Sequence, residues 1–178
     1  MSDATPPPIT LPASLQGVEP VKAIRTPARL DYTYTAGRAT SRFLRDVAKK
    51  RLVGQRCPVC HKVYVPPRGS CPIDGVELAE DVELGHTGTI TSFCVVNVPF
   101  MGTLMEIPYT SGLILLDGSD IPIMHLIQEV DVNDVHSGMR VEAVWVPDEE
   151  IGPTLESIKY FRPNGEPDAP YDTYKDNV

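Results

Sequence analysis

The sequence predicts a mainly β protein, in which a five-stranded OB-fold barrel is preceded by an amphipathic helix and a zinc ribbon. Three observations favour this class. Two Cys-Pro turns of the kind that holds a zinc ion begin at Cys57 and Cys71. Apolar residues recur at helical spacing just before the first turn. After the second turn the period changes to alternation, over several short segments separated by turn residues.

Length and composition limit the alternatives. A chain of 178 residues and 19.5 kDa holds one ordinary domain with a small appendage. No apolar run approaches the roughly 18 residues needed to span a bilayer, and the N-terminus lacks the features of a signal peptide. Three of the 4 cysteines are clustered with metal-ligand spacing, which is typical of reduced thiols. We therefore expect a cytoplasmic protein that does not enter the membrane.

The first third of the chain is expected to contain an arm, a strand and a helix. Residues 1–30 include a Pro-Pro-Pro run and little apolar periodicity, which predicts a flexible arm. Residues 31–35 alternate aromatic and polar side chains, which predicts a strand. Residues 40–53 predict an amphipathic helix that stops at Gly54. The helical spacing is carried by Phe43, Leu44, Val47, Ala48 and Leu52.

The two Cys-Pro turns predict a structural zinc site with one unusual ligand. Cys57 and Cys60 belong to the first turn, and Cys71 opens the second. Asp74 stands where a fourth cysteine is expected, and a carboxylate oxygen is an accepted zinc ligand. His61 is the reserve fourth ligand. The alternative is a metal-free turn in which Asp74 only caps the backbone.

Five strands are predicted after the ribbon, with a turn at residues 117–120 between the second and the third. A short helical or turn segment at 131–135 separates the third strand from the fourth, which is the plan of an OB-fold barrel. A sandwich fragment is less consistent, because it needs more strands. The predicted strands are residues 88–98, 110–116, 121–128, 139–146 and 154–161.

These elements define four parts. They are the arm, a helix-and-ribbon part at 31–80, the barrel at 81–163, and an acidic tail at 164–178 that is expected on the surface or against a partner.

The net charge of -8 is unevenly distributed. Residues 42–68 contain 8 of the 16 basic residues and a single acid, whereas 20 of the 24 acids follow Gly69. The basic part suits a phosphate-bearing small molecule or an acidic partner surface, although a solvated helix face has the same pattern. The acidic barrel disfavours nucleic acid, because nucleic-acid binding requires a basic, aromatic face.

We find no self-sufficient active site in the sequence and expect a non-catalytic protein. Cys94 lies in an apolar segment and is predicted to be a packed core residue. His86, His125 and His136 are scattered rather than spaced as ligands or as a base with its orienting group, so each is predicted to lie in a loop or on the barrel surface. There is no Ser-His-Asp order and no glycine-rich phosphate loop.

Several motifs resemble a known family. They are the helix, the ribbon from Arg56 to Pro67, the Gly85-His-Thr-Gly88 strand entry, Ile107-Pro108-Tyr109, and the Ser137-Gly138-Met139-Arg140-Val141 run. Together, over about residues 31–163, they resemble acyl-CoA-associated proteins that pair a rubredoxin-like zinc ribbon with an OB-fold and were long catalogued as a domain of unknown function. Within that family the chain is most similar to the partner subunits of lipid-transfer-protein-type thiolases, which include aldolases that shorten steroid side chains.

The resemblance implies a function. It implies a non-catalytic subunit of a hetero-oligomer that helps to bind acyl-CoA and completes or stabilises the site of a thiolase-fold partner. A free-standing acyl-CoA shuttle is the second hypothesis, and a nucleic-acid module is the third. The candidate ligands for the coenzyme A phosphates are Arg42, Arg45, Lys49, Lys50, Arg56 and Lys62.

Overall fold

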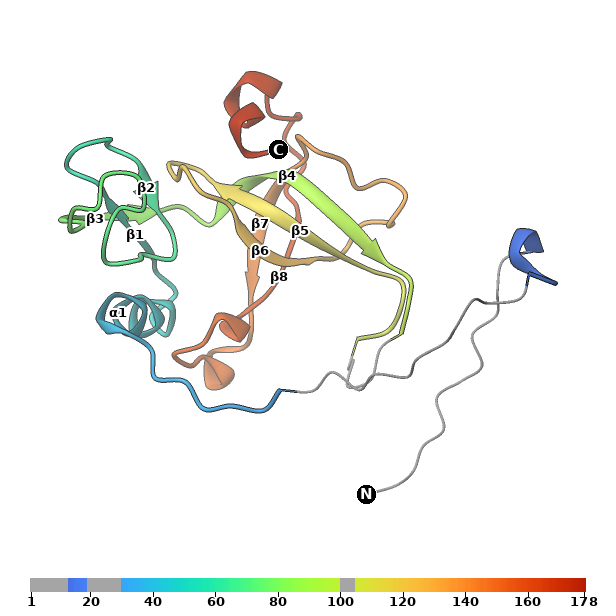
Figure 1. Ribbon diagram of the computed structural model, residues 1–178, viewed down its shortest axis with the longest axis horizontal. Helices are drawn as coiled ribbons and strands as arrows, with labels where there is room; N and C mark the ends of the chain where they lie inside the picture. Colours follow the sequence, from blue (N-terminus) through green and yellow to red (C-terminus); the bar gives the residue numbers. More distant parts are fainter. Residues whose placement is uncertain (1–12, 19–29, 100–104) are drawn as a thin grey trace. The chain divides into compact units, whose positions relative to one another are not determined.

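The computed structural model describes residues 13–18, 30–99 and 105–178 (Figure 1). The chain divides into two units, residues 1–34 and 35–178. In the first unit, η1 (Ala13–Leu15) is a short 3-10 helix, and most of the predicted flexible arm lies outside the described residues. The strand predicted at residues 31–35 is wrong, since this segment pairs with no strand. Alternating side chains make a strand only where a second backbone supplies the hydrogen bonds.

The helix α1 (Arg38–Val47) is shorter than predicted. It buries Phe43 and Val47 and ends at Ala48, after which Lys50 adopts a positive φ of 55° and turns the chain. Leu52 therefore belongs to strand β1 (Leu52–Arg56) instead of a last helical turn. The prediction of a helix to residue 53 is wrong, because a buried leucine fits the apolar side of a strand as well as that of a helix.

Gly54 was predicted to end the helix, but it lies in the middle of β1. A Cβ at this position would lie 3.0 Å from the carbonyl oxygen of Tyr64 and 3.0 Å from the Val63 side chain. These two residues form strand β2 (Val63–Tyr64), which pairs with β1. The glycine thus allows the two strands of the ribbon to approach closely.

The ribbon sheet has the order β2-β1-β3 and includes a strand that the sequence pattern did not predict. Strand β3 (Glu80–Leu84) pairs antiparallel with β1 along its whole length, from Leu52 opposite Leu84 to Arg56 opposite Glu80. Three of its five residues are acidic, a composition that disfavours a strand. Arg42 of α1 and Arg56 of β1 form ion pairs with Asp81 and Glu80, and these pairs make the acidic residues compatible with the strand.

The predicted five-stranded barrel is confirmed, and it is closed in the order β4-β5-β6-β8-β7. A turn at residues 131–134 lies between β6 and β7 in the chain. In the barrel β8 lies between β6 and β7, which is the strand order of an OB-fold. The turn predicted at 117–120 joins β5 to β6, with Gly118 at a positive φ of 87°. The strands are β4 (Thr87–Val96), β5 (Tyr109–Leu116), β6 (Ile123–Ile127), β7 (Arg140–Trp145) and β8 (Ile158–Pro163).

The start of the fifth barrel strand differs from the prediction. Three residues of the predicted strand form the 3-10 helix η3 (Leu155–Ser157), and β8 begins at Ile158. Thr154 caps η3 by accepting a hydrogen bond from the backbone N–H of Glu156 at 3.3 Å. A side-chain cap of this kind competes locally with strand formation. A second 3-10 helix, η2 (Asp148–Glu150), precedes it.

The helix, the ribbon sheet and the barrel share one hydrophobic core. Phe43 and Val47 of α1 and Leu52 of β1 belong to the same buried cluster as the barrel residues Ile90 and Phe161. A polar link joins the same parts. The His86 ring contacts the carbonyl oxygen of Lys50 through Nε2 at 2.9 Å and accepts a hydrogen bond from Trp145 Nε1 at 3.3 Å. The ribbon and the barrel therefore form one body, although they differ in sequence character.

The acidic tail packs on the barrel. The backbone N–H of Ala169 donates to the carbonyl oxygen of Gly138 at 2.8 Å, and Tyr174 is only 8% exposed. Two short 3-10 helices, η4 (Tyr171–Thr173) and η5 (Lys175–Asn177), end the chain above the barrel (Figure 1). None of the described helices is long and apolar enough to cross a membrane.

Closure of the barrel generates a stability prediction at Gly88. A Cβ built there would lie 2.6 Å from the carbonyl oxygen of Leu115, so Gly88→Ala forces β4 away from β5. We expect a loss of about 1–3 kcal/mol in the free energy of unfolding, measured by urea denaturation. The matched control is Gly85→Ala, where the nearest atom is 3.8 Å away. Equal stability of the two variants would contradict the tight contact.

Candidate metal centre and arginine-lined cavity

Four side chains of the ribbon converge on one point. The ligand atoms of Cys57, Cys60, Cys71 and Asp74 all lie within 4.8 Å of one another. Cys57 and Cys71 are buried, and the other two are half-buried. His61, the reserve ligand of the sequence analysis, is exposed and lies outside this cluster.

Two turns of the same construction produce the cluster. In the first turn the backbone N–H of His61 donates to Cys57 O at 3.1 Å, and in the second Gly75 N–H donates to Cys71 O at 2.9 Å. Both closing residues have a positive φ, 62° for His61 and 69° for Gly75. The Cys-Pro-x-x-x repeat therefore folds twice into one turn geometry, and each turn directs two side chains inward.

The spacing of the donor atoms fits a tetrahedral metal site. Asp74 Oδ2 lies 3.2 Å from both Cys57 Sγ and Cys71 Sγ, and Cys60 Sγ lies 3.6 Å from Cys71 Sγ. Two sulfur atoms bound at about 2.3 Å to one tetrahedral zinc are roughly 3.8 Å apart, which is close to the last distance. Three sulfurs and one carboxylate are also a donor set that zinc accepts.

Neighbouring groups act on the donors in different directions: the pKa values of Asp74 and Cys71 are lowered, whereas the hydrogen bond with Asp74 raises the pKa of Cys60 to about 12. Hydrogen bonds from the thiols of Cys60, Cys57 and Cys71 lower the pKa of the Asp74 carboxyl, which is thus a carboxylate. The hydrogen bond with Cys71 Sγ, at 3.4 Å, and burial both raise the pKa of Tyr64, so its hydroxyl stays protonated and donates to the sulfur. Such donors stabilise negative charge on a ligand.

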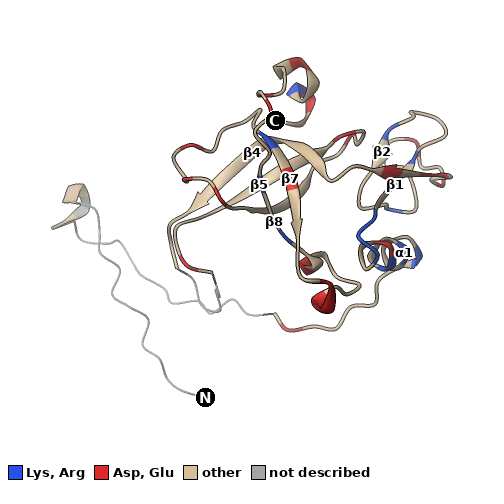
Figure 2. Cartoon of the chain, turned by 180° about the vertical axis from the view of Figure 1, so that it is seen from behind, with Lys and Arg blue, Asp and Glu red and all other residues tan. Residues whose placement is uncertain are grey.

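The six basic residues predicted to meet coenzyme A phosphates differ in their ion pairing. Figure 2 shows Lys and Arg on α1 and the ribbon. Three of the six are paired with acids of the same protein: Arg42 with Asp81 at 2.5 Å, Arg56 with Glu80 at 3.2 Å, and Lys50 with Asp148. Within the described residues Arg45, Lys49 and Lys62 make no ion pair.

One of the six, Arg42, lines a cavity of about 530 Å³ between α1 and the ribbon. Arg38 lies one helical turn earlier and lines the same cavity, and it was missed in the sequence analysis. Its signal was the i, i+4 spacing of the two arginines, which places both on one helix face. Gln55 also lines it, is 7% exposed, and has no hydrogen-bond partner for Oε1 among the described residues.

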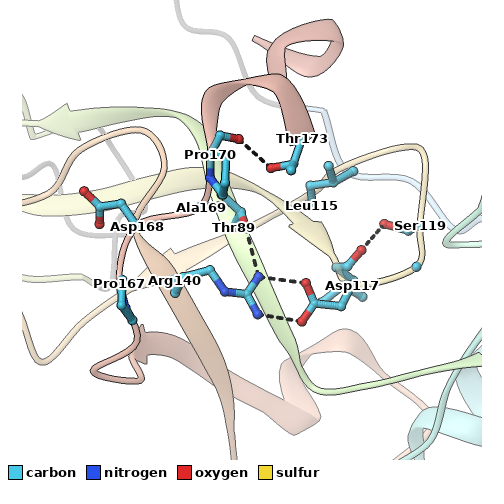
Figure 3. A pocket seen from close by; sticks show the side chains of 12 residues that line it. Thr89, Leu115, Asp117, Ser119, Arg140, Pro167, Asp168, Ala169, Pro170 and Thr173 are labelled. Atoms are coloured by element: carbon cyan, nitrogen blue, oxygen red, sulfur yellow. Dashed lines mark hydrogen bonds and ion pairs between the residues drawn. The ribbon is translucent and has the colours of Figure 1, made fainter.

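A second cavity, of about 420 Å³, lies between the barrel and the tail (Figure 3). Arg140 is the basic residue that lines it. Its guanidinium donates to both carboxylate oxygens of Asp117 at 2.7 Å, to Thr89 Oγ1 at 3.0 Å, and to Glu166 at 3.0 Å. These hydrogen bonds hold the pKa of Asp117 below its usual value. Two carboxylates thus neutralise Arg140, and the described residues that line this cavity include no other Lys or Arg.

Cys94 is exposed, so its prediction as a packed core residue is wrong. The apolar segment around it lies where β4 and β5 extend beyond the rest of the barrel, and the outward side of this hairpin is not covered by the described residues. Apolar neighbours in sequence indicate a strand but not which side of it is buried.

The histidines lie apart, as predicted, although not all of them are on the surface. His86 joins the ribbon to the barrel, His136 is exposed, and His125 is half-buried in β6. The His125 ring packs edge-on against Phe161 at 5.6 Å, and burial lowers its pKa. In the described part of the chain no histidine or carboxylate is hydrogen-bonded to Cys94.

Comparisons with known proteins identify the family. Residues 45–76 match the ChsH2 rubredoxin-like zinc ribbon domain, and residues 81–146 match the ChsH2 C-terminal OB-fold domain. A protein of Methanocaldococcus jannaschii named a DUF35 domain-containing scaffold protein is 33% identical over 95 residues, which are 53% of this chain and 67% of that protein. The chain belongs to the DUF35 family. The family resemblance found in the sequence is thereby confirmed.

Other relatives of this DUF35 protein are larger or more distant. A probable enoyl-CoA hydratase alpha subunit of Thermomonospora curvata is 31% identical over 122 residues, 68% of this chain, which spans only 36% of that subunit. Two solved structures share the fold. The Ltp2-ChsH2(DUF35) aldolase matches with a TM-score of 0.55 and 24% identity over 74% of this chain and 98% of the matched chain. A DUF35 protein of unknown function from Sulfolobus solfataricus matches with a TM-score of 0.53 and 16% identity over 71% and 84%.

The contact between tail and barrel generates a pH prediction. His136 Nδ1 lies 2.7 Å from Asp134 O and Nε2 lies 3.0 Å from Asp168 Oδ2, so the doubly protonated ring donates twice. The Asp134 carbonyl, then Asp168, raise the pKa of His136. The contribution of protonated His136 to the free energy of unfolding is fully present below the unfolded-state pKa of about 6.5. It is lost as the pH rises through the higher folded-state pKa.

We expect a small effect, a few tenths of a kcal/mol, because both side chains are half exposed. An NMR titration of the His136 ring measures the folded-state pKa from which this effect follows. Asp168→Asn should lower the observed pKa, whereas Asp172→Asn, in the same tail, should leave it unchanged. Identical titration of all three proteins would show that the contact is absent.

Proposed function

We propose that this DUF35 protein is a non-catalytic accessory subunit of a thiolase-type enzyme that acts on acyl-CoA, such as an aldolase or thiolase of lipid or steroid side-chain breakdown. The observation that carries the proposal is membership of a family in which one relative is named a scaffold protein and one structure is titled an Ltp2-ChsH2(DUF35) aldolase. A further relative is named as one subunit of a probable enoyl-CoA hydratase. The proposal also includes a cytoplasmic location.

Zinc is the metal proposed for the ribbon, with Cys57, Cys60, Cys71 and Asp74 as its ligands. The convergence of these four donors within 4.8 Å supports the assignment. Four protein ligands complete a tetrahedral shell, which is typical of a structural site rather than a catalytic one. The bound ion would hold the two turns together, where only a small buried cluster of Cys57, Tyr64, Cys71 and Leu78 packs around them.

The acyl-CoA contact is proposed at the arginine-lined cavity between α1 and the ribbon. Arg38 and Arg42 present two guanidinium groups, which bind phosphate oxygens bidentately. Arg42 already shares its charge with Asp81, so Arg38 is the more available of the two. Arg45, Lys49 and Lys62 add positive charge nearby in sequence, whereas the ion pairs of Lys50 and Arg56 give these two residues a structural role.

The metal assignment is tested by elemental analysis of protein prepared under reducing, chelator-free conditions. We expect about one zinc per chain. Cys57→Ser should lower the zinc content and the melting temperature together, because the ion stabilises the folded ribbon. Asp74→Cys should retain zinc and Asp74→Ala should bind it more weakly. Zinc content near zero in the unaltered protein would overturn the assignment.

The accessory role is tested by activity measurements with and without the thiolase-type subunit of the same organism. We expect no acyl-CoA turnover by this chain alone and turnover by the complex. Arg38→Ala should raise KM for the CoA ester roughly 10- to 100-fold with little change in kcat, since one charged phosphate contact contributes roughly 1.5–3 kcal/mol. Lys175→Ala, a cation of the tail, is the matched control. Turnover by the isolated chain would contradict the proposal.

A further inference from the structure

One side of the barrel sheet has an unusual surface. Residues opposite one another in an antiparallel pair share a face. Ser92 of β4 lies opposite Leu113 of β5, which lies opposite Met124 of β6. Along β5 buried residues alternate with less buried ones, and Leu113 is one of the less buried residues. The row formed by Ser92, Leu113 and Met124 therefore points outward. The β4–β6 face is defined here as the outward residues Ser92, Cys94, Val96, Tyr109, Ser111, Leu113, Met124 and Leu126.

The β4–β6 face contains no charged side chain. The outward side of an antiparallel sheet is usually polar where it faces water. Here it consists of aliphatic, aromatic and small side chains, and Met124 is 71% exposed. Residues 87–105 contain no Asp, Glu, Lys or Arg, although these types make up 22% of the chain. A contiguous apolar surface on a protein of this charge is typical of a contact with another macromolecule.

The face is also shaped to receive side chains. A hollow of about 230 Å³ lies over β5, between Phe93 and Cys94 on one side and Met124 on the other. Its outward lining on β5 includes the small residue Ser111, whereas a Cβ at Gly112 would point towards buried Ile127. A second hollow, of about 450 Å³, lies between β6 and η3 and is lined by Leu126, Leu155 and Ile158, among others. Both hollows border Ser111 and Met124, so they are neighbours on this side of the barrel, and together they are called the trough here.

The charges of the barrel indicate what covers this trough. After Gly69 the chain has 20 acids and 4 basic residues, so a second copy would bring two strongly negative bodies together. Glu156 and Lys159 both line the second hollow, and exposed Glu106 precedes β5. The acidic excess of the chain after Gly69 therefore favours a partner whose contact patch is apolar at its centre and basic at its rim. Apolar cores with charged rims are typical of specific interfaces.

We propose that the β4–β6 face is the docking surface for the enzyme subunit, which inserts uncharged aliphatic or aromatic side chains into the trough and surrounds them with Lys and Arg. This inference rests on the proposed accessory function and adds the surface through which it acts. The face lies on the barrel, whereas the zinc turns and the arginine-lined cavity lie on the ribbon and α1. The proposed docking surface therefore shares no side chain with either ribbon site.

Cys94 is a native reporter of this contact. It is exposed, belongs to the face, and is the one thiol of the 4 in the chain that lies outside the ribbon. The probe is N-ethylmaleimide, applied to the zinc-containing chain alone and to its complex with the co-expressed thiolase-type subunit, with Cys94→Ser as the blank. We expect the alkylation rate of Cys94 to fall at least tenfold in the complex.

A charge on the face tests the same inference through affinity. Met124→Asp should raise Kd for the enzyme subunit at least tenfold, measured by titration calorimetry, because the partner would have to bury the new carboxylate. The control is Val178→Asp, since Val178 is 69% exposed and lies in the tail. Unchanged melting temperatures show that both variants fold.

The outcomes are separable. A stable complex in which Cys94 reacts at the free rate and Met124→Asp binds as tightly as the control overturns the docking surface but keeps the accessory function. Failure of any complex to form overturns the accessory function and the docking surface with it. Protection of Cys94 in the isolated chain, with sedimentation as a dimer that Met124→Asp dissociates, assigns the face to a second copy and also overturns the inference.

Discussion

The antiparallel pairing of β1 with β3 joins the two cysteine turns to each other and to the barrel. β1 leads directly into the first cysteine turn, and β3 follows the second and continues into the barrel. The pairing therefore brings the two turns together and ties them to β4. At one end of the ladder Leu52 opposite Leu84 belongs to the shared core, and at the other Arg56 pairs with Glu80. A single ladder thus connects the metal site to the apolar interior.

The charge distribution has a structural meaning as well as a functional one. Arg51 bonds Glu83 at 2.8 Å and Arg42 bonds Asp81 at 2.5 Å, so part of the basic cluster is matched to the acids of β3. Exposed ion pairs of this kind contribute little energy each, about 0–1 kcal/mol. Their importance is that they neutralise acidic side chains of β3, so that this acid-rich segment can form a strand beside β1. The basic surface without an ion pair among the described residues is smaller than the sequence indicates, and it includes Arg45, Lys49 and Lys62 as well as Arg38.

Three surfaces of the protein are therefore distinct in chemistry and in position. The cysteine turns offer soft donors, the cavity beside α1 offers guanidinium groups, and the β4–β6 face offers neither charge nor strong polarity. An accessory subunit benefits from this separation, because partner docking, ligand contact and metal binding then do not compete for the same side chains. The tail extends the barrel surface at a fourth place, where Arg140 is held by Asp117 and Glu166.

Features that depend on local spacing could be predicted from the residues alone. The two Cys-Pro turns, the aspartate in the fourth position and the five barrel strands follow from periods of a few residues, which physical chemistry translates directly into turns and strands. Contacts across the chain could not be predicted in this way: acidic β3 is a strand, α1 ends at Val47, Arg42 pairs with Asp81, and Cys94 faces outward. These outcomes are set by non-local backbone pairing and by which side of a strand is covered, neither of which is encoded in the residues nearby.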